Sequence, residues 1–314
     1  MRLSCHEPRQ MHACISIEDG AARVKALTEK QVRDYRQNGF LFPLSVLTPD
    51  EAAAGLSNIV RLEARIGTPL ARAHKKYRSG TYTFLPWVEA LCRHPRVLDA
   101  VENVIGPDIL VFWATFFIKE AGSPAFTAWH QDSTYFGLEP HEHVTAWIAL
   151  SDASKEAGCM EVLPPNGTPR QHHHANSRLE HSINAAGQVI VEPLDETGIT
   201  AMELKAGEMS LHHTLCPHRS APNAASHLRV GYGISYIPAH VRTTGSRRLP
   251  ALLVRGRNKG NFDLMPSPCA EFDPAAVEVG ERFFTRFMEH YAEQVERHAA
   301  QFAHREAVDN TLRT

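Results

Sequence analysis

Hydrophobic and polar positions separate the chain into a helical first third and a β-rich middle. Before residue 106, apolar residues recur at helical spacing in segments that begin at Thr28, Thr48 and Pro86. A threonine can cap the free N–H groups of a first turn, and proline fits the first helical position. We therefore expect helices at residues 28–38, 49–66 and 86–105, and a short strand at residues 40–43.

The pattern changes after Gly106 and Pro107, where short runs of β-branched and aromatic residues alternate with clusters of Gly, Pro and Asn. Such runs are typical of strands, and the absence of strand–helix–strand alternation argues against a doubly wound sheet. The expected fold is mainly β with helical additions around a β-sandwich or jelly roll. Its strands are expected at residues 109–119, 126–130, 143–151, 159–163, 188–192, 200–204, 208–213 and 228–238.

Two later segments lack a regular pattern. Residues 171–177 hold three consecutive histidines and are expected to form a surface loop, and residues 247–268 are irregular and basic. Asp273 and Pro274 then begin a long helix that is expected to reach about residue 305. Its aromatic stripe should pack in the core or at a homodimer interface, rather than bind a cofactor; the stripe consists of Phe283, Phe284, Phe287 and Tyr291.

These patterns predict one main domain. Residues 1–25 have little periodicity and are expected to form a flexible arm, whereas residues 26–314 are expected to form a single domain. Its expected parts are a helical segment at 26–106, a jelly-roll core at 107–240, and an irregular segment with the C-terminal helix at 241–314.

Composition argues against several kinds of partner. The 33 lysines and arginines nearly balance 35 aspartates and glutamates, so no strong field draws the protein to nucleic acid or to an anionic membrane. No apolar run is long enough to span a bilayer, and the first residues lack the apolar stretch of a secretory signal. The six cysteines form no C-x-x-C pair and are expected to be reduced thiols in a cytoplasmic protein.

His130 and Asp132 are the first candidates for chemistry. Two positions apart on a strand, both side chains point to one face and can reach the same metal ion. His218, from a distant strand, would complete the two-histidine, one-carboxylate set of non-haem Fe(II) oxygenases. Alternatively, His130 is a satisfied core histidine and Asp132 a turn residue. His212 or His213 could also replace His218, although neighbouring strand residues face opposite sides.

Arg229 lies in an otherwise apolar segment, on the strand that follows His218. An unpaired cation is costly in such a place, and the planar guanidinium can bind a carboxylate through two hydrogen bonds. Arg229 is therefore expected to hold an acidic co-substrate. The alternative is a charge at the surface.

Four stretches together carry a resemblance to a known family. They are Trp129–Leu138 (WHQDSTYFGL), Val144–Asp152 (VTAWIALSD) running into Glu156–Pro164 (EAGCMEVLP), Gly207–Asn223 (GEMSLHHTLCPHRSAPN), and Arg229. On these motifs the chain resembles the phytanoyl-CoA dioxygenase family of Fe(II)/2-oxoglutarate-dependent oxygenases, and most closely its bacterial members. Residues 164–168 depart from it, since relatives often have Pro-Gly-Ser-His there.

The resemblance implies a fold, cofactors and site residues. The fold would be a double-stranded β-helix, which is a cupin-like jelly roll. Fe(II) would bind to His130, Asp132 and His218, and would be joined by O2 and by 2-oxoglutarate, the co-substrate. Ascorbate would serve as the reductant in vitro. Arg229 would bind the distal carboxylate of 2-oxoglutarate; the other implied co-substrate residues are Ser220, Thr127, Trp147 and Thr115.

The intact carboxylate bears on the reaction. Halogenating relatives replace it with Ala or Gly, so Asp132 favours hydroxylation, or another oxidation, coupled to decarboxylation of 2-oxoglutarate to succinate. The expected substrate is a small or medium-sized organic molecule. Two alternatives are a jelly-roll binding protein without catalysis and a non-oxidative metalloenzyme on the same scaffold.

Substrate contacts are expected from two further segments. The basic run at residues 74–78 is in one interpretation a solvated face. In another it holds a substrate anion, because relatives place a loop over the active site here, and Lys76 and Tyr82 are then the candidates. Tyr135 and Phe136 are expected to cover the substrate because they follow the ligand pair directly. His141 and His143 are expected near the mouth of the pocket.

Overall fold

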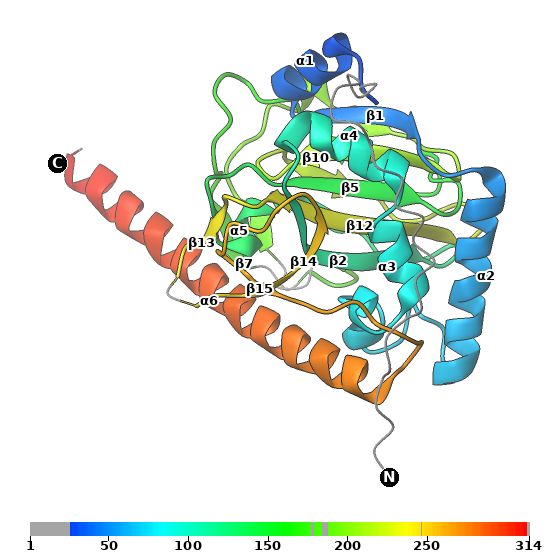
Figure 1. Cartoon of the computed structure of the whole chain (residues 1–314). Helices are drawn as coiled ribbons and strands as arrows, with labels where there is room; N and C mark the ends of the chain where they lie inside the picture. Colours follow the sequence, from blue (N-terminus) through cyan, green and yellow to red (C-terminus); the bar gives the residue numbers. More distant parts are fainter. Residues whose placement is uncertain (1–25, 177–178, 184–187, 246, 313–314) are drawn as a thin grey trace.

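The computed structural model describes residues 26–176, 179–183, 188–245 and 247–312, so the arm expected at residues 1–25 lies outside the described chain. A large sheet forms its centre (Figure 1), in the order β1 (Phe40–Ser45), β10 (Glu208–His213), β5 (Val144–Ala149), β12 (Arg229–Pro238), β2 (Ile109–Lys119), β14 (Pro250–Arg255) and β15 (Asp263–Leu264). A second sheet has the order β3 (Thr127–His130), β11 (His218–Ser220), β6 (Met160–Val162) and β9 (Thr200–Met202). Short pairs join β4 (Leu138–Glu139) to β13 (Arg242–Thr243) and β7 (His174–Asn176) to β8 (Gln188–Ile190).

Both sheets contribute to one cavity. Trp147 and Arg229 reach it from the large sheet, and His130 and His218 reach it from the small one. Within each of these two sheets the strands pair antiparallel, apart from β14 with β15. Two antiparallel sheets closed around a cavity form the double-stranded β-helix, which confirms the expected jelly-roll core.

The helices begin and end where local chemistry predicts. Thr28 and Thr48 form capping boxes at the starts of the first two helices, and Gly39 and Gly67 end them in left-handed conformation. In Figure 1 the helices between residues 86 and 105 lie over one face of the large sheet, and the first helix lies at its β1 edge. The helices are α1 (Glu29–Asn38), α2 (Pro49–Ile66), α3 (Pro86–Cys92), α4 (Pro95–Ile105), α5 (Ser133–Phe136) and α6 (Pro274–Leu312), with 3-10 turns at η1 (Lys75–Tyr77), η2 (Thr81–Thr83) and η3 (Glu196–Gly198).

Strand β12 separates the helical layer from the cavity. The hydroxyl of Tyr236 donates to the carbonyl of Cys92 in α3 at 2.9 Å, so one face of the strand is tied to the helices. On the other face, a Cβ at Gly231 would lie 1.8 Å from the ring of Trp147. Glycine at this position therefore leaves the space in which the Trp147 ring lies over the strand and borders the cavity.

Helix α6 crosses the side of the molecule below the sheets (Figure 1). Phe287 stacks on Trp113 with a ring separation of 3.6 Å, and Tyr291 stacks on Tyr135 at 4.9 Å. Phe283, Phe287 and Tyr291 are buried in the main core. The aromatic stripe was expected in the core or at a homodimer interface, and these three residues lie in the core.

Two predictions for the second half were wrong. Residues 250–255, expected to be irregular, form β14, which extends the large sheet beyond β2. His174, expected in a surface loop, is buried in β7, where its backbone N–H donates to His298 of α6 at 3.0 Å. Both elements are short and depend on partners far away in the sequence, which a local pattern does not reveal.

The described cysteines agree with reduced thiols. Cys92, Cys159, Cys216 and Cys269 are free, and Cys5 and Cys14 lie outside the described chain. None of the helices in the described ranges is both long and apolar enough to span a bilayer.

Candidate metal centre and co-substrate cavity

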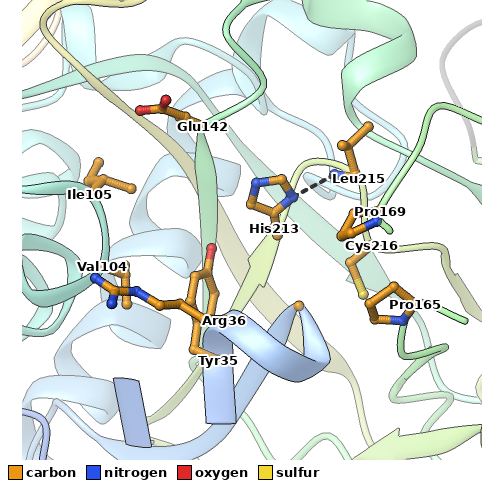
Figure 2. A pocket seen from close by; sticks show the side chains of 11 residues that line it. Tyr35, Arg36, Val104, Ile105, Glu142, Pro165, Pro169, His213, Leu215 and Cys216 are labelled. Atoms are coloured by element: carbon orange, nitrogen blue, oxygen red, sulfur yellow. Dashed lines mark hydrogen bonds between the residues drawn. The ribbon is translucent and has the colours of Figure 1, made fainter. Parts of the chain in front are cut away.

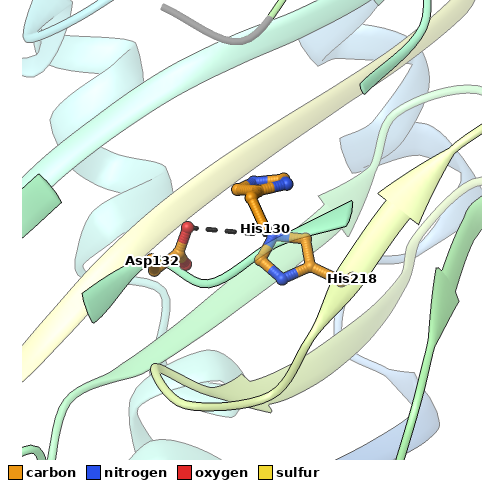
Figure 3. A group of neighbouring side chains, drawn as sticks. All are labelled: His130, Asp132 and His218. Atoms are coloured by element: carbon orange, nitrogen blue, oxygen red, sulfur yellow. Dashed lines mark ion pairs between the residues drawn. The ribbon is translucent and has the colours of Figure 1, made fainter. Parts of the chain in front are cut away.

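Two histidines face each other across neighbouring strands of the small sheet. His130 in β3 is the direct partner of His218 in β11, and their ring centroids are 4.1 Å apart. With Asp132 they form a group whose ligand atoms all lie within 4.8 Å of one another (Figure 3). Strand pairing thus brings together residues that are far apart in the sequence.

Asp132 reaches this group in a different way from the one expected. The strand ends at His130, and Asp132 has helical backbone angles (φ −63°, ψ −33°) at the start of α5. The same-face argument for two residues on one strand was therefore wrong in its geometry. The turn into α5 instead carries the carboxylate back, so that Oδ1 lies 3.8 Å from Nε2 of His218.

Both histidines present the same nitrogen to the centre. Nδ1 of His130 lies 2.8 Å from the carbonyl oxygen of Ala128, and Nδ1 of His218 lies 3.0 Å from that of Cys216. A carbonyl can only accept, so Nδ1 carries the proton and Nε2 keeps its lone pair for a metal. Burial lowers the pKa of both imidazoles, which keeps them neutral. This donor set fits Fe(II).

Thr145, which the sequence did not single out, and His212, which it offered only as a substitute ligand, hold the carboxylate of Asp132. Thr145 of β5 donates its hydroxyl to Oδ2 at 2.8 Å, and Nε2 of His212 lies 3.5 Å from the same oxygen. Burial raises the pKa of Asp132, but the hydrogen bond with His212 acts in the opposite direction, and that pKa lies well below its usual value. Oδ1 is left to face the metal position.

Replacing Thr145 with valine tests this support. Valine keeps the shape but removes the hydroxyl, so Asp132 loses its closest partner; we expect Fe(II) affinity to fall about tenfold, within the range for outer-shell partners of metal ligands. Anaerobic Fe(II) titration is the measurement. Thr214→Val is a matched control, because it removes a buried hydroxyl that has no partner among the described residues. Equal Fe(II) affinity in the Thr145 variant and the wild type would contradict the role.

A small cavity extends from the metal group to Arg229 of β12. Arg229 is buried, its Nη1 donates to the carbonyl of Gly158 at 2.9 Å, and its guanidinium lies 5.4 Å from the centre of the Trp147 ring. Its Nε has no hydrogen-bond partner in the described part of the chain. Burial lowers the pKa of Arg229 to about 10, so the group is still a cation at neutral pH. An orphaned donor on a buried cation suits a carboxylate ligand.

Ser220 and Thr127 border this cavity and contact each other, with 2.7 Å between their hydroxyl oxygens. Lys119, a residue that the sequence analysis missed, donates to the Ser220 hydroxyl at 2.8 Å. It is the direct strand partner of Arg229, and burial together with the Arg229 charge lowers its pKa to about 7. Lys119 could have been found from the sequence because it directly follows the apolar run 109–118.

A larger cavity of about 160 Å³ opens on the other side of the metal group. Tyr135 and Phe136 line it, and so does Thr115, which therefore lies away from Arg229. Lys76 and Tyr82 do not line it. Lys76 turns outward to Glu281, with Nζ and Oε1 3.0 Å apart, and Tyr82 is buried in the core.

His143 and His213 lie apart from the metal position, whereas the ring of His212 lies 4.7 Å from that of His218. His143 is fully buried and packs edge-on against Phe136 rather than lying at a pocket mouth; burial lowers its pKa to about 3. His212 and His213 face opposite sides, as expected for neighbouring strand residues. His213 borders a separate cavity between Tyr35 and Cys216 (Figure 2).

Two histidines, one carboxylate and a buried arginine in the cavity of a double-stranded β-helix are the arrangement that is typical of non-haem Fe(II) oxygenases. The family model for phytanoyl-CoA dioxygenase (PhyH) matches residues 35–231. The chain belongs to this family.

Individual relatives share a quarter or less of their aligned residues with this chain in two curated examples. The phytanoyl-CoA dioxygenase domain-containing protein 1 homolog of Caenorhabditis elegans is 22% identical over 55% of this chain and 62% of its own length, so the match spans less than two thirds of that relative. L-proline trans-4-hydroxylase of Streptomyces griseoviridis is 25% identical over 68% of this chain and 89% of that enzyme. Among solved structures, the apo form of ThoJ, a non-heme monooxygenase, has a TM-score of 0.75 and 30% identity, covering 85% of this chain and 99% of that one.

Proposed function

We propose that this protein is a non-haem Fe(II)- and 2-oxoglutarate-dependent dioxygenase that hydroxylates a small or medium-sized organic molecule. The proposal rests on the cavity in which His130, Asp132 and His218 converge beside the buried guanidinium of Arg229. Three protein ligands leave coordination positions open for a co-substrate and oxygen. A buried cation whose Nε lacks a partner among the described residues supports a dicarboxylate co-substrate.

Each residue has a defined task in this proposal. His130, Asp132 and His218 would hold Fe(II), which supplies oxygen activation coupled to decarboxylation of 2-oxoglutarate to succinate. Arg229 would bind the distal carboxylate of 2-oxoglutarate, with Ser220 and Thr127 beside it. The ring of Trp147 would exclude water from this ion pair and so strengthen it. Retention of Asp132 favours hydroxylation over halogenation.

The test is the conversion of 2-oxoglutarate in the absence of a primary substrate. With Fe(II), ascorbate and air, we expect slow formation of succinate together with O2 consumption, and we expect EDTA to stop both. Calorimetry of 2-oxoglutarate binding to the protein loaded with Fe(II) under nitrogen is the companion measurement. Failure of the protein both to bind 2-oxoglutarate and to form succinate would refute the proposal. A binding protein would bind without turnover, and a non-oxidative enzyme would act without consuming O2.

A further inference from the structure

We propose that the primary substrate carries an anionic head group, a carboxylate or a phosphate, that binds to Arg78, while its apolar body lies against α6. This inference rests on the proposed function, because it names the substrate class of the same site. It follows from the position of Arg78 relative to Arg229, from the charges in the larger cavity, and from the residues that α6 contributes.

The two cavities meet at the metal group and diverge from it. Both are lined by His130, Asp132 and Thr145, whereas Arg229 borders only the smaller cavity and Arg78 only the larger one. The two arginines therefore lie in different cavities that share the metal group. A co-substrate that spans Arg229 and the metal uses both of its carboxylates in the smaller cavity. Arg78 is then available to a different anion.

The backbone around Arg78 is fixed to the sheet. Its carbonyl accepts from the N–H of Phe116 at 2.9 Å, and the N–H of Gly80 donates to the carbonyl of Ala114 at 2.9 Å. Between them, the hydroxyls of Ser79 and Thr115 lie 2.7 Å apart. Residues 78–80 thus pair with β2 as a further strand would, and this pairing fixes the backbone of Arg78.

The Arg78 guanidinium is half-buried and forms no ion pair with a carboxylate of the described chain. Its contact is a 3.5 Å hydrogen bond from Nη1 to the carbonyl of Ala71, which leaves other donors for a ligand. By contrast, Nη2 of Arg72, which precedes Arg78 in the chain, lies 3.0 Å from Oε1 of Glu120, the residue after β2. Burial lowers the pKa of Arg78, although an arginine stays charged at neutral pH.

The charges of the larger cavity favour an anion. Its cations are Arg78 and Lys75, and Asp132, which faces the metal, is the sole carboxylate among its described lining residues. Burial and the nearby Arg78 charge lower the pKa of Lys75, which indicates that the two cations sense each other. An anionic head group would gain a bidentate partner in Arg78.

Helix α6 supplies the apolar side of the cavity. Phe284, Phe287, Met288 and Tyr291 line it, and the stacks of Phe287 on Trp113 and of Tyr291 on Tyr135 hold the helix in place. Helix α6 lies beyond residues 35–231, the segment that the family model matches. An aliphatic or aromatic body is the complement of such a surface.

Calorimetry with simple probes tests the inference. The protein is loaded with Fe(II) and saturating 2-oxoglutarate under nitrogen, so that Arg229 is occupied and no turnover occurs, and is titrated with octanoate, octyl phosphate and octan-1-ol. We expect at least one of the anions to bind about tenfold or more tightly than the alcohol. The tighter anion identifies the head group. Equal binding of all three probes, or a Kd weaker than about 1 mM for both anions, would overturn the inference.

Three variants test whether Arg78 itself causes the preference for an anion. Arg78→Met should weaken the tighter anion about tenfold while leaving octan-1-ol and 2-oxoglutarate within about twofold, and Arg78→Lys should retain part of the preference. Arg72→Met, in the exposed part of the same loop, should change none of the three. If Arg78→Met weakens 2-oxoglutarate as much as octanoate, the arginine serves the co-substrate and the inference is wrong. If the proposed function itself is wrong, the wild-type protein will not bind 2-oxoglutarate, and this result is distinct from the outcomes above.

Discussion

Replacing Asp132 with alanine is expected to lower succinate formation at least about 100-fold, since even outer-shell partners of metal ligands are worth roughly 10- to 100-fold. The carboxylate is the one anionic member of the metal group, and the two histidines beside it are neutral. Without it, two imidazoles would hold a dication with no compensating charge, so Fe(II) affinity should fall as well. Anaerobic Fe(II) titration and the succinate assay measure the two effects.

Asp34→Ala on α1 is the control for this substitution, because it removes a partly exposed aspartate that pairs with Lys30. Near-UV circular dichroism checks that the Asp132 variant keeps its packed core. An Asp132→Ala protein that binds Fe(II) and forms succinate at the wild-type rate would show that the ligand assignment is wrong.

Replacing Arg229 with methionine should raise the Kd for 2-oxoglutarate at least about 100-fold. Removing one partner of a buried charge pair costs about 3 to 5 kcal/mol, because the remaining carboxylate is left in a water-poor site. Fe(II) affinity should stay within about twofold, since effects at separate sites are usually independent. The Kd of Arg229→Lys for 2-oxoglutarate should lie between those of the wild type and the methionine variant, because a lysine offers a point charge instead of a planar fork.

Arg219→Met is the matched control for Arg229. Arg219 adjoins His218 in the sequence, but its side chain points away from the cavity. Its Nε lies 2.7 Å from Oε2 of Glu161, and its guanidinium lies over the ring of Trp129. Its loss should leave 2-oxoglutarate affinity unchanged. The co-substrate role of Arg229 is wrong if its methionine variant binds 2-oxoglutarate as the wild type does.

The two arginines make these experiments complementary. Arg229 variants should affect the co-substrate, and Arg78 variants should affect the primary substrate. A protein in which both substitutions weakened 2-oxoglutarate would have a single anion site that extends through both cavities. We expect two sites because the two arginines line different cavities, which share the part around the metal group.

The sequence by itself determined the elements and the candidate ligands. Helix ends depend on nearby residues, so Thr28, Thr48 and Gly39 marked them correctly. The strand with Arg229 was recognisable from its apolar run, and a charged residue within such a run required a partner. His130, Asp132 and His218 were proposed from residue type and spacing, and the structure brings them together.

The tertiary structure alone decided which side chains meet. Strand pairing sets His212 opposite Thr145 and so brings both to the Asp132 carboxylate, and it sets Lys119 opposite Arg229. The basic run offered several cations, but the pairing of residues 78–80 with β2 gives Arg78 to the cavity and leaves Lys76 with Glu281. Register and packing depend on contacts between distant segments, and a one-residue shift reverses the face of every side chain. Local sequence could therefore name the chemistry of this protein, whereas long-range packing chose the residues that surround it.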